Sequence, residues 1–412
     1  MNIAIMGYGV VGSGVAELLA KNHEQIVCKS TRDKLQLKYI LDLRTFPGDP
    51  FESLVISDFS KIVNDDSVKI VVETMGGLHP AFEFVRDCLA AGKSVVTSNK
   101  ELVAEKGIEL IKLAQEKNVN FLFEASVGGG IPIIRPLTQC LAANEIGEVA
   151  GILNGTTNFI LTMMIKKGMS FEDALRLAQE NGYAERDPSA DILGHDACRK
   201  ISILAALSFG KHVYPKDVHT EGITEITLAD VDYAAAWGGV IKLLGRAKKA
   251  DNGKISAIVS PAFVANSSML AGVDDVFNAV LVRGDAVGDV LFYGRGAGKL
   301  PTASAVVADV IDCAQHAEKR KPFGWGDAEE GYVADYNACE TVLYVRAAAD
   351  DEGAAKAQIE SAFGKVRYLT RANAPTGEFA FITPCGQEKA LRDALSKITA
   401  AKVENTIRVT DY

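Results

Sequence analysis

Asn2-Ile-Ala-Ile-Met6 runs directly into Gly7-Tyr-Gly-Val-Val-Gly12, so an apolar strand pattern is followed at once by a Gly-x-Gly-x-x-Gly motif and then by an amphipathic helix pattern. In that context each glycine has a mechanical task. Gly7 permits a tight turn, Gly9 lets a pyrophosphate approach the backbone, and Gly12 lets the helix pack closely on the strand. Because the N-terminus of a helix attracts anions, the motif predicts a dinucleotide-binding site.

The alternation of short apolar runs and helical patterns continues to about residue 125. Amphipathic stretches at Pro80 to Ala91 and Leu102 to Lys117 separate the strand patterns, which is typical of a parallel sheet with crossover helices. We therefore expect an α/β protein whose residues 1–127 form a Rossmann-type, doubly wound parallel sheet, completed by a returning helix around residues 299–317. The expected strands are Ile3 to Met6, Leu37 to Leu41, Lys69 to Glu73, Ser94 to Thr97 and Asn120 to Glu124.

Residues 128–298 differ in composition and pattern, with frequent glycines and a mixture of strand and helix patterns. We interpret them as an α+β domain that binds substrate, mediates dimerisation and supplies the second wall of a cleft. Ser170 and Asp173 form a capping box, and Gly182 ends the helix that they begin. The polar loop between Gly182 and a helix that begins near Ile192 is where we expect the chemistry.

The sequence pattern changes again in residues 338–412 and predicts the order strand, helix, strand, strand, helix, strand. This βαββαβ order is typical of a small sandwich that binds a ligand or another copy of itself, and both uses stay open. The expected elements are a strand at Thr341 to Ala347, a helix at Glu352 to Phe363, strands at Lys365 to Thr370 and Glu378 to Thr383, a helix at Gln387 to Ile398 and a strand at Val403 to Thr410.

Composition and charge argue against several classes of protein. The chain has 412 residues with 44 Lys and Arg against 53 Asp and Glu, and a net charge of −9 disfavours binding to nucleic acid or anionic lipid. No uncharged apolar run approaches the ~20 residues that span a membrane, and no basic leader precedes the first apolar stretch. The 7 cysteines are dispersed without a disulfide framework or a zinc-ligand spacing, so we expect a reducing, cytoplasmic location.

Asp42 is the best match for the acidic residue that holds the ribose 2′-hydroxyl at the end of the second strand. It lies 30 positions after Gly12 instead of about 20, because the polar insert Lys21 to Lys34 lengthens the connection. A carboxylate here repels a 2′-phosphate, whereas Arg44 attracts one, so we favour NAD and leave NADP open. The alternative interpretation is that Asp42 is a solvated turn residue.

Further motifs lie at the carboxyl edge of the expected sheet and beyond it. Thr97-Ser-Asn-Lys100 and Glu124-Ala-Ser-Val-Gly-Gly-Gly-Ile-Pro132 each end a strand, where open α/β sheets bind ligands. They are followed by Asn154-Gly-Thr-Thr-Asn158 and by Gly182-Tyr-Ala-Glu-Arg-Asp-Pro188. In this order, from about residue 2 to about residue 315, the sequence resembles homoserine dehydrogenase. The resemblance implies reversible NAD- or NADP-dependent oxidation of L-homoserine to L-aspartate 4-semialdehyde, a step of threonine and methionine biosynthesis.

The resemblance also implies roles for charged residues of the expected cleft. Lys200 exchanges a proton with the substrate hydroxyl, and Lys100 lies in the same pocket. The residues expected to bind the substrate are Glu185, Asp191 and Asp196. The substrate carries an ammonium and a carboxylate beside its hydroxyl, so a pocket with both signs of charge suits it.

The spacing of Asp196 and Lys200, i and i+4, places both on one face of a helix expected from about Ile192 to Phe209. An unperturbed lysine has a pKa near 10.4, so Lys200 must be desolvated or flanked by Lys100 to accept a proton near neutrality. The Asp196 carboxylate instead favours the charged form of Lys200. We therefore expect an alkaline optimum or a protonated lysine that polarises the carbonyl in the reductive direction. Without the surrounding motifs the pair would read as an ordinary surface pair.

For the cofactor and an ion the resemblance implies two more sets of residues. A structural monovalent cation, sodium, sits in a glycine-rich turn that aims carbonyl oxygens inward, and a tight turn with a capping carboxylate is an equal alternative. The expected cation ligands are Glu124, Val127, Gly129 and Ile131. The residues expected to bind NAD or NADP are Gly7, Gly9, Val10, Val11, Gly12, Asp42, Thr74, Thr97, Lys100, Gly182 and Gly298.

Two segments depart from the family pattern. Tyr293-Gly-Arg-Gly-Ala-Gly298 resembles a second glycine loop that closes over the cofactor, but Arg295 stands where many members carry proline. The tail resembles a module of the ACT type, yet its first turn, Ala349-Asp-Asp-Glu-Gly-Ala354, lacks the Pro-Gly pair that shapes a threonine site. Whether the tail binds threonine is therefore open.

Two other functions stay open from the sequence. One is a different amino-acid or semialdehyde dehydrogenase of the same architecture, and the other is a non-catalytic NAD-binding protein that senses an amino acid. We expect the partners to be the small-molecule substrate and further copies of the chain, in a homodimer or a higher homo-oligomer, and neither nucleic acid nor membrane.

Overall fold

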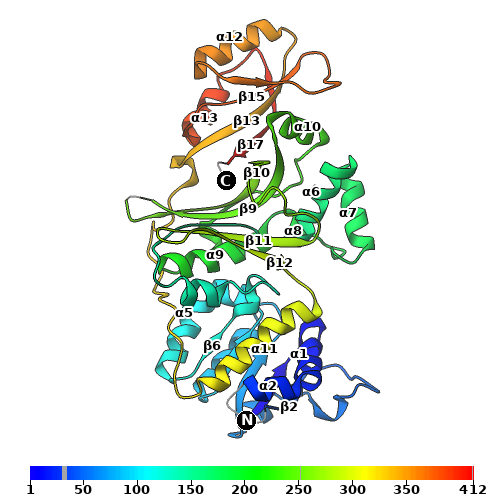
Figure 1. The fold of residues 1–412 in the computed structure, drawn as a ribbon, viewed down its shortest axis with the longest axis vertical. Coiled ribbons are helices and arrows are strands. Elements are labelled where there is room, and N and C mark those ends of the chain that lie inside the picture. Colours follow the sequence, from blue (N-terminus) through cyan, green and yellow to red (C-terminus); the bar gives the residue numbers. More distant parts are fainter. Residues whose placement is uncertain (30–34, 251, 411) are drawn as a thin grey trace.

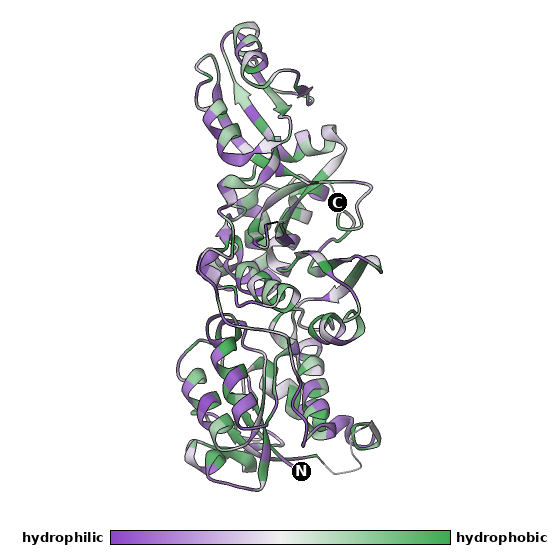
Figure 2. Cartoon of the chain, turned by 90° about the vertical axis from the view of Figure 1, so that its left-hand side faces the viewer, coloured by the Kyte–Doolittle hydropathy of each residue, from purple (hydrophilic) through white to green (hydrophobic). Residues whose placement is uncertain are grey.

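A computed structural model describes residues 1–29, 35–250, 252–410 and 412. Figures 1 and 2 show three regions stacked along the long axis, with the N-terminal region at one end and the C-terminal helices and strands at the other. Among the described residues no helix is both long and apolar enough to span a membrane.

The N-terminal region contains a six-stranded parallel sheet in the order β3-β2-β1-β4-β5-β6. The predicted α/β class and doubly wound sheet are confirmed. The five expected strands are present, but the last is shorter than predicted because Glu124 already belongs to a 3-10 turn, Glu124–Ser126. The strands are β1 (Asn2–Met6), β2 (Gln36–Leu41), β3 (Val55–Ile56), β4 (Val68–Glu73), β5 (Ser94–Thr97) and β6 (Phe121–Leu122).

Helices cover both faces of this sheet, because alternate strand residues point to opposite sides. Ile3 and Ile5 pack against α1 (Val10–Lys21), α2 (His23–Lys29) and α11 (Lys299–Gln315). Ala4 and Met6 pack against the other set of helices. Helix α11 lies beside α1 (Figure 1), and a Cβ on Gly14 would come within 2.9 Å of the Lys299 carbonyl oxygen. The second set is α3 (Ser60–Val63), α4 (Ala81–Ala90) and α5 (Lys100–Glu116).

The predicted polar insert Lys21 to Lys34 contains helix α2, and its residues 30–34 lie outside the described part of the chain. The insert joins α1 to β2, so it lengthens the connection as expected.

The second region is built on a mixed sheet whose helices cover one face. Helices α6, α9 and α10 pack on that face, and a smaller apolar cluster around Leu244, Leu270 and Leu281 lies on the other. The elements are β7 (Ile146–Ile152), α6 (Gly155–Lys167), α7 (Phe171–Glu180), α8 (Ser189–Ile192), α9 (His195–Phe209), β8 (His219–Thr220), α10 (Leu228–Trp237), β9 (Gly239–Lys249), β10 (Ile255–Ala265), β11 (Phe277–Gly284) and β12 (Gly288–Arg295), with a short π-helix at Pro136–Cys140 and 3-10 turns at Pro215–Asp217 and Tyr336–Ala338. A further 3-10 turn, Glu52–Leu54, lies between β2 and β3 of the N-terminal sheet.

The tail has the predicted βαββαβ order with one additional two-residue strand, β16, before its second helix, and its sheet is continuous with the second one. Strand β17 pairs in parallel with β10 through Ala262 with Arg408 and Phe263 with Val409, which gives one 11-stranded sheet. Its main path runs β12-β11-β7-β9-β10-β17-β13-β15-β14, and β8 and β16 pair with β10 and β13 beside that path. The division at residue 338 stays a prediction. The tail elements are β13 (Glu340–Ala348), α12 (Glu352–Phe363), β14 (Arg367–Leu369), β15 (Glu378–Ile382), β16 (Gly386–Gln387), α13 (Glu388–Leu395) and β17 (Lys402–Val409).

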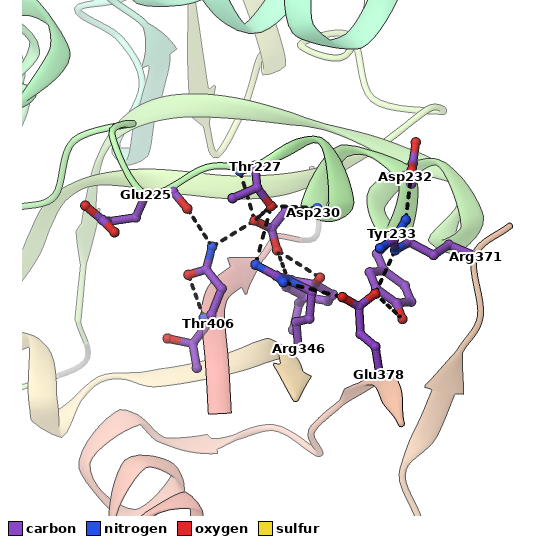
Figure 3. Close-up of polar contacts among 11 residues, drawn as sticks. Glu225, Thr227, Asp230, Asp232, Tyr233, Arg346, Arg371, Glu378 and Thr406 are labelled. Carbon is purple, nitrogen blue, oxygen red and sulfur yellow. Dashed lines mark hydrogen bonds and ion pairs between the residues drawn. The ribbon is translucent and has the colours of Figure 1, made fainter. Parts of the chain in front are cut away.

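A buried polar network ties helix α10 to the tail (Figure 3). The Asp230 carboxylate is fully buried, and it accepts hydrogen bonds from the Tyr344 hydroxyl at 3.0 Å and from Arg346 Nε at 2.9 Å. Asn405 Nδ2 donates to the second carboxylate oxygen at 3.0 Å. Because these donors come from β13 and β17, the tail is held rigidly against the region that forms the candidate site.

Candidate active site

A cleft of about 610 Å³ opens between the N-terminal sheet and the second region. It lies at the carboxyl ends of the parallel strands, where doubly wound sheets bind ligands. Its walls come from the N-terminus of α1, the start of α5, the turn after β6, the start of α6, the loop between α7 and α9, helix α9 itself and the loop after β12. Segments that are far apart in the sequence therefore meet here.

The glycine motif has the predicted geometry. A Cβ on Gly12 would lie 2.0 Å from the Gly7 carbonyl oxygen, and Gly7 has a φ of +91°, so only glycine fits at both positions. A Cβ on Gly9 would meet nothing within 4 Å, which leaves open space beside the helix. No side chain among the described residues caps the N-terminus of α1, so its N–H groups are available to an anion. The loop therefore fits a dinucleotide pyrophosphate.

Two of the residues expected to bind the cofactor support the loop instead of lining the cleft. The Thr74 hydroxyl donates to the Gly7 carbonyl oxygen at 2.8 Å, and the fully buried Thr97 hydroxyl donates to the Glu73 carboxylate. These contacts occupy the side-chain hydroxyls of Thr74 and Thr97, and the role of both residues in cofactor binding stays a prediction. Val10, Val11, Lys100, Gly182 and Gly298 do line the cleft.

Asp42 stands at the end of β2, beside the glycine loop. One carboxylate oxygen accepts the Tyr8 N–H at 2.8 Å, and the Arg44 guanidinium donates to both oxygens at 3.0 and 2.9 Å. The Arg44 hydrogen bonds hold the pKa of Asp42 well below its usual value. The alternative of a purely solvated turn residue is therefore wrong, since Asp42 is tied into the loop.

The charged residues of the cleft meet at Asp196. Lys200 Nζ donates to one Asp196 oxygen at 2.7 Å and to the Leu153 carbonyl oxygen at 2.7 Å, and Lys100 Nζ lies 3.0 Å from the other Asp196 oxygen. Asp196 and Lys200 are on one face of α9, as their spacing predicts, and both are buried. An ammonium has three N–H donors, so Lys200 keeps one for the cleft.

Electrostatics fixes the charges of this group. Burial alone would raise the pKa of Asp196, but the ammonium groups of Lys200 and Lys100 outweigh it and hold that pKa well below the usual value. In return, the Asp196 charge raises the pKa of Lys100. Asp196 is therefore a carboxylate and Lys100 an ammonium at neutral pH, which favours a protonated donor in the cleft.

Asn154, the first residue of the Asn-Gly-Thr-Thr motif, lines the cleft and had no predicted role. Its carbonyl oxygen accepts the Thr157 N–H at 2.8 Å and so caps helix α6. Its amide group donates to Asp191 at 2.7 Å and to Asp196 at 2.9 Å. Burial raises the pKa of Asp191. Asn154 thus joins both carboxylates, and the Asn-Gly-Thr-Thr sequence before a helix was the available signal.

Glu185 and Glu124, also predicted as site residues, have contrasting environments. Glu185 lines the cleft in the loop between α7 and α8 and is exposed. The Glu124 carboxylate is buried and accepts the N–H groups of Ile133, Ile134 and Arg135 at 2.6, 2.8 and 2.7 Å. The Glu124 side chain therefore caps this turn, and both the cation site and the alternative of a capping carboxylate alone stay predictions.

The turn after Glu124 contacts the second glycine loop. The Gly130 N–H donates to the Arg295 carbonyl oxygen at 3.0 Å, and a Cβ on Gly129 would lie 2.2 Å from the Gly296 carbonyl oxygen. In the described ranges no group of three or more His, Cys, Asp or Glu side chains is arranged to hold a metal ion.

Two family models match the chain: "Homoserine dehydrogenase, NAD binding domain" over residues 7–124 and "Homoserine dehydrogenase" over residues 132–311. The chain belongs to the homoserine dehydrogenase family. A homoserine dehydrogenase of Neisseria gonorrhoeae is 39% identical over 425 residues, covering 97% of this chain and 95% of that protein. The solved homoserine dehydrogenase of Thiobacillus denitrificans superposes with a TM-score of 0.90 at 38% identity and covers 100% of this chain and 98% of that one.

The chain is accordingly an NAD(P)-dependent oxidoreductase of amino-acid biosynthesis that interconverts L-homoserine and L-aspartate 4-semialdehyde. The alternatives of a sensor and of a different dehydrogenase are set aside by these full-length homoserine dehydrogenase relatives. The tail lies beyond both family models. A hyperthermophilic archaeal homoserine dehydrogenase, solved in complex with NADPH, matches 76% of this chain and 97% of that one at 29% identity, with a TM-score of 0.64.

Proposed function

We propose that Lys200 is the residue that exchanges a proton with the substrate oxygen, and that Lys100 and Asp196 hold it in the required state. The observation that carries this proposal is the Asp196 carboxylate, which contacts both ammonium groups inside the cleft at 2.7 and 3.0 Å. An ordinary surface pair would be exposed to solvent, whereas the Lys200 side chain is 10% exposed and that of Asp196 7%.

In the reductive direction Lys200 donates its remaining N–H proton to the oxygen of the semialdehyde as that oxygen gains negative charge. Asp196 and the Leu153 carbonyl hold the ammonium in place, so the proton donor does not have to be oriented during the reaction. The bound nicotinamide cofactor supplies or accepts the hydride. In the oxidative direction the neutral Lys200 amine accepts the proton of the substrate hydroxyl.

Substrate binding follows from the remaining charges. We assign the ammonium group of homoserine to carboxylates of the cleft, with Glu185 at the exposed entrance and Asp191 and Asp196 on the buried side. The substrate carboxylate is left to Lys100, whose side chain is 41% exposed and reaches the cleft from the start of α5. Each charged group of the zwitterionic substrate then meets protein groups of the opposite charge.

The cofactor is assigned to the glycine loop and to Asp42. N–H groups at the start of α1 bind the pyrophosphate, and the Asp42 carboxylate accepts hydrogen bonds from the ribose hydroxyls. Since Arg44 already donates to both Asp42 oxygens, NADP would require Arg44 to turn from Asp42 to the 2′-phosphate. This competition supports NAD as the preferred cofactor.

A structural monovalent cation, if sodium is bound, is assigned to main-chain oxygens of Glu124, Val127, Gly129 and Ile131. Three N–H groups already donate to the Glu124 carboxylate, so the main-chain oxygens of the turn are the less occupied ligands. No chemical step is assigned to this ion.

We also propose that the chain forms a homodimer through its second region. Strand β12 is the edge of the long sheet, and Val287 and Tyr293 are exposed beside it. An uncovered edge with exposed apolar side chains suits association with a second copy. Light scattering should give twice the 44.0 kDa of one chain, and a mass of one chain at micromolar concentration would contradict a dimer.

Lys200→Ala tests the assignment of the proton donor. We expect kcat, followed at 340 nm, to fall at least ~100-fold, which is the usual scale for losing a general acid. The dissociation constant for NAD should stay unchanged, because Lys200 comes from α9 and not from the glycine loop. Lys166→Ala is the matched control, since Lys166 pairs with Asp274 and does not line the cleft. A folded Lys200→Ala enzyme within tenfold of the wild-type rate would reject the role.

A further inference from the structure

Asn278, in the wall of the cleft, has a buried side-chain oxygen without a hydrogen-bond donor. The residue lies near the start of β11, is 2% exposed and lines the cleft. Among the described residues, nothing donates to its side-chain oxygen Oδ1. Nearly all buried polar side-chain atoms in proteins have a partner, so an unpaired one in a ligand cleft indicates that the ligand supplies the donor.

The amide of Asn278 lies close to two glycines. A Cβ on Gly296, in the second glycine loop, would lie 2.0 Å from Asn278 Nδ2, so the amide packs directly against that loop. A Cβ on Gly155, at the start of α6, would lie 3.5 Å from Oδ1. Oδ1 therefore lies between the second glycine loop and the start of α6. Gly155 directly follows Asn154, whose side chain donates to Asp196, the carboxylate that contacts Lys200 and Lys100.

The position of Asn278 Oδ1 corresponds to the place where the nicotinamide carboxamide must lie. Hydride transfer needs C4 of the nicotinamide about 3–3.5 Å from the reacting carbon of the substrate, and the oxygen on that carbon must reach Lys200. The carboxamide is attached to the ring carbon next to C4, so it must lie near the lysine group as well. This step rests on the role proposed above for Lys200.

We propose that Asn278 Oδ1 accepts a hydrogen bond from the carboxamide NH₂ of the nicotinamide and thereby positions the ring. A neutral acceptor matches a neutral amide donor. The substrate ammonium is matched better by the carboxylates Glu185 and Asp191, which line the same cleft. Asn278 is thus a residue that orients the cofactor and selects dinucleotides that carry an amide NH₂.

The test measures binding, by calorimetry on the full chain, for NAD, for its 3-acetylpyridine analogue and for its thionicotinamide analogue. The acetylpyridine analogue replaces the NH₂ group by a methyl group, whereas the thionicotinamide analogue keeps it. Wild-type protein should bind the acetylpyridine analogue ~10-fold more weakly than the thionicotinamide analogue, as expected for one lost hydrogen bond that leaves a buried acceptor unpaired.

The variants separate this contact from a structural effect. In Asn278→Leu, which removes the acceptor, the two analogues should bind within about twofold of each other. Asn278→Asp keeps an acceptor and should retain the preference. Asn120→Leu is the matched control, because Asn120 is equally buried but is satisfied by the main chain of residues 316, 319 and 321 and lies outside the cleft.

A full preference for the NH₂ analogue in Asn278→Leu overturns the proposal, and so does a wild-type protein that binds the two analogues equally. If the leucine variant does not fold, Asn278→Ala replaces it with the same expectation. Loss of turnover in Lys200→Ala is a separate outcome, since these dissociation constants are measured without reaction. The failure of one proposal can therefore be distinguished from the failure of the other.

Discussion

Asp230→Ala should loosen the tail from the second region. The variant removes a fully buried carboxylate that accepts three hydrogen bonds from the tail, from Tyr344, Arg346 and Asn405 (Figure 3). Its main effect is to leave the Arg346 guanidinium, whose side chain is 12% exposed, without its closest counter-charge. Breaking a buried ion pair from one side costs about 3–5 kcal/mol. Glu378 stays 3.6 Å from Arg346, so we expect the lower end, about 3 kcal/mol.

The assay is urea unfolding followed by the fluorescence of Trp237, which ends helix α10, in a Trp325→Phe background. Glu352→Ala is the control, because Glu352 pairs with Lys356 at an exposed position of α12 and should contribute below about 1 kcal/mol. Asp230→Asn keeps an oxygen acceptor and should fall between the two. A free-energy loss for Asp230→Ala no larger than that for Glu352→Ala would refute the reasoning.

Three further predictions concern other parts of the molecule. Gly9→Ala should fold normally, since its Cβ meets nothing within 4 Å, but should weaken NAD binding at least ~10-fold by filling the space for the pyrophosphate; unchanged affinity would contradict the cofactor site. Glu185→Gln should raise KM for homoserine more than it lowers kcat, and a change in kcat alone would remove Glu185 from substrate binding. Burial lowers the pKa of His212 to about 4, and the neutral ring accepts the Trp325 Nε1–H at 3.1 Å. His212 takes up a proton in the unfolded chain below about pH 6.5, whereas the folded chain keeps the ring neutral. The contribution of the neutral ring to the free energy of unfolding is therefore fully present above that pH and is lost as the pH falls toward 4, by up to ~3 kcal/mol. Urea midpoints of His212→Gln at pH 7 and 5 should differ less than those of wild type, and equal differences would contradict this assignment.

The site residues that could be predicted from sequence either lie one helical turn apart or follow directly after a strand. Asp196 and Lys200 lie one helical turn apart, so a helix brings them together whatever surrounds it. Lys100 follows a strand of a parallel sheet, and the carboxyl ends of such strands meet at one edge. The glycine motif is likewise local, and the geometry of Gly12 agrees with the task assigned to it.

The rest depends on contacts between distant segments, which no local pattern encodes. The pairing of β17 with β10 involves two residue pairs, and a strand that adds to a sheet edge looks the same in sequence as one in a separate module. Asn278 stands in an apolar strand with nothing to mark it. For Thr74, Thr97 and Glu124 the sequence indicated the neighbourhood but not the side-chain partners, because those partners, the Gly7 carbonyl oxygen, the Glu73 carboxylate and the Ile133 N–H, come from other segments.

A crystal structure of the chain with NADH and L-homoserine, a pair that cannot react together, tests the central claim most directly. We expect the hydroxyl oxygen of homoserine about 2.6–3.2 Å from Lys200 Nζ, with Asp196 still in contact with both lysines. A hydroxyl group bound away from Lys200 and Lys100, or an Asp196 carboxylate that has left both ammonium groups, would contradict the account.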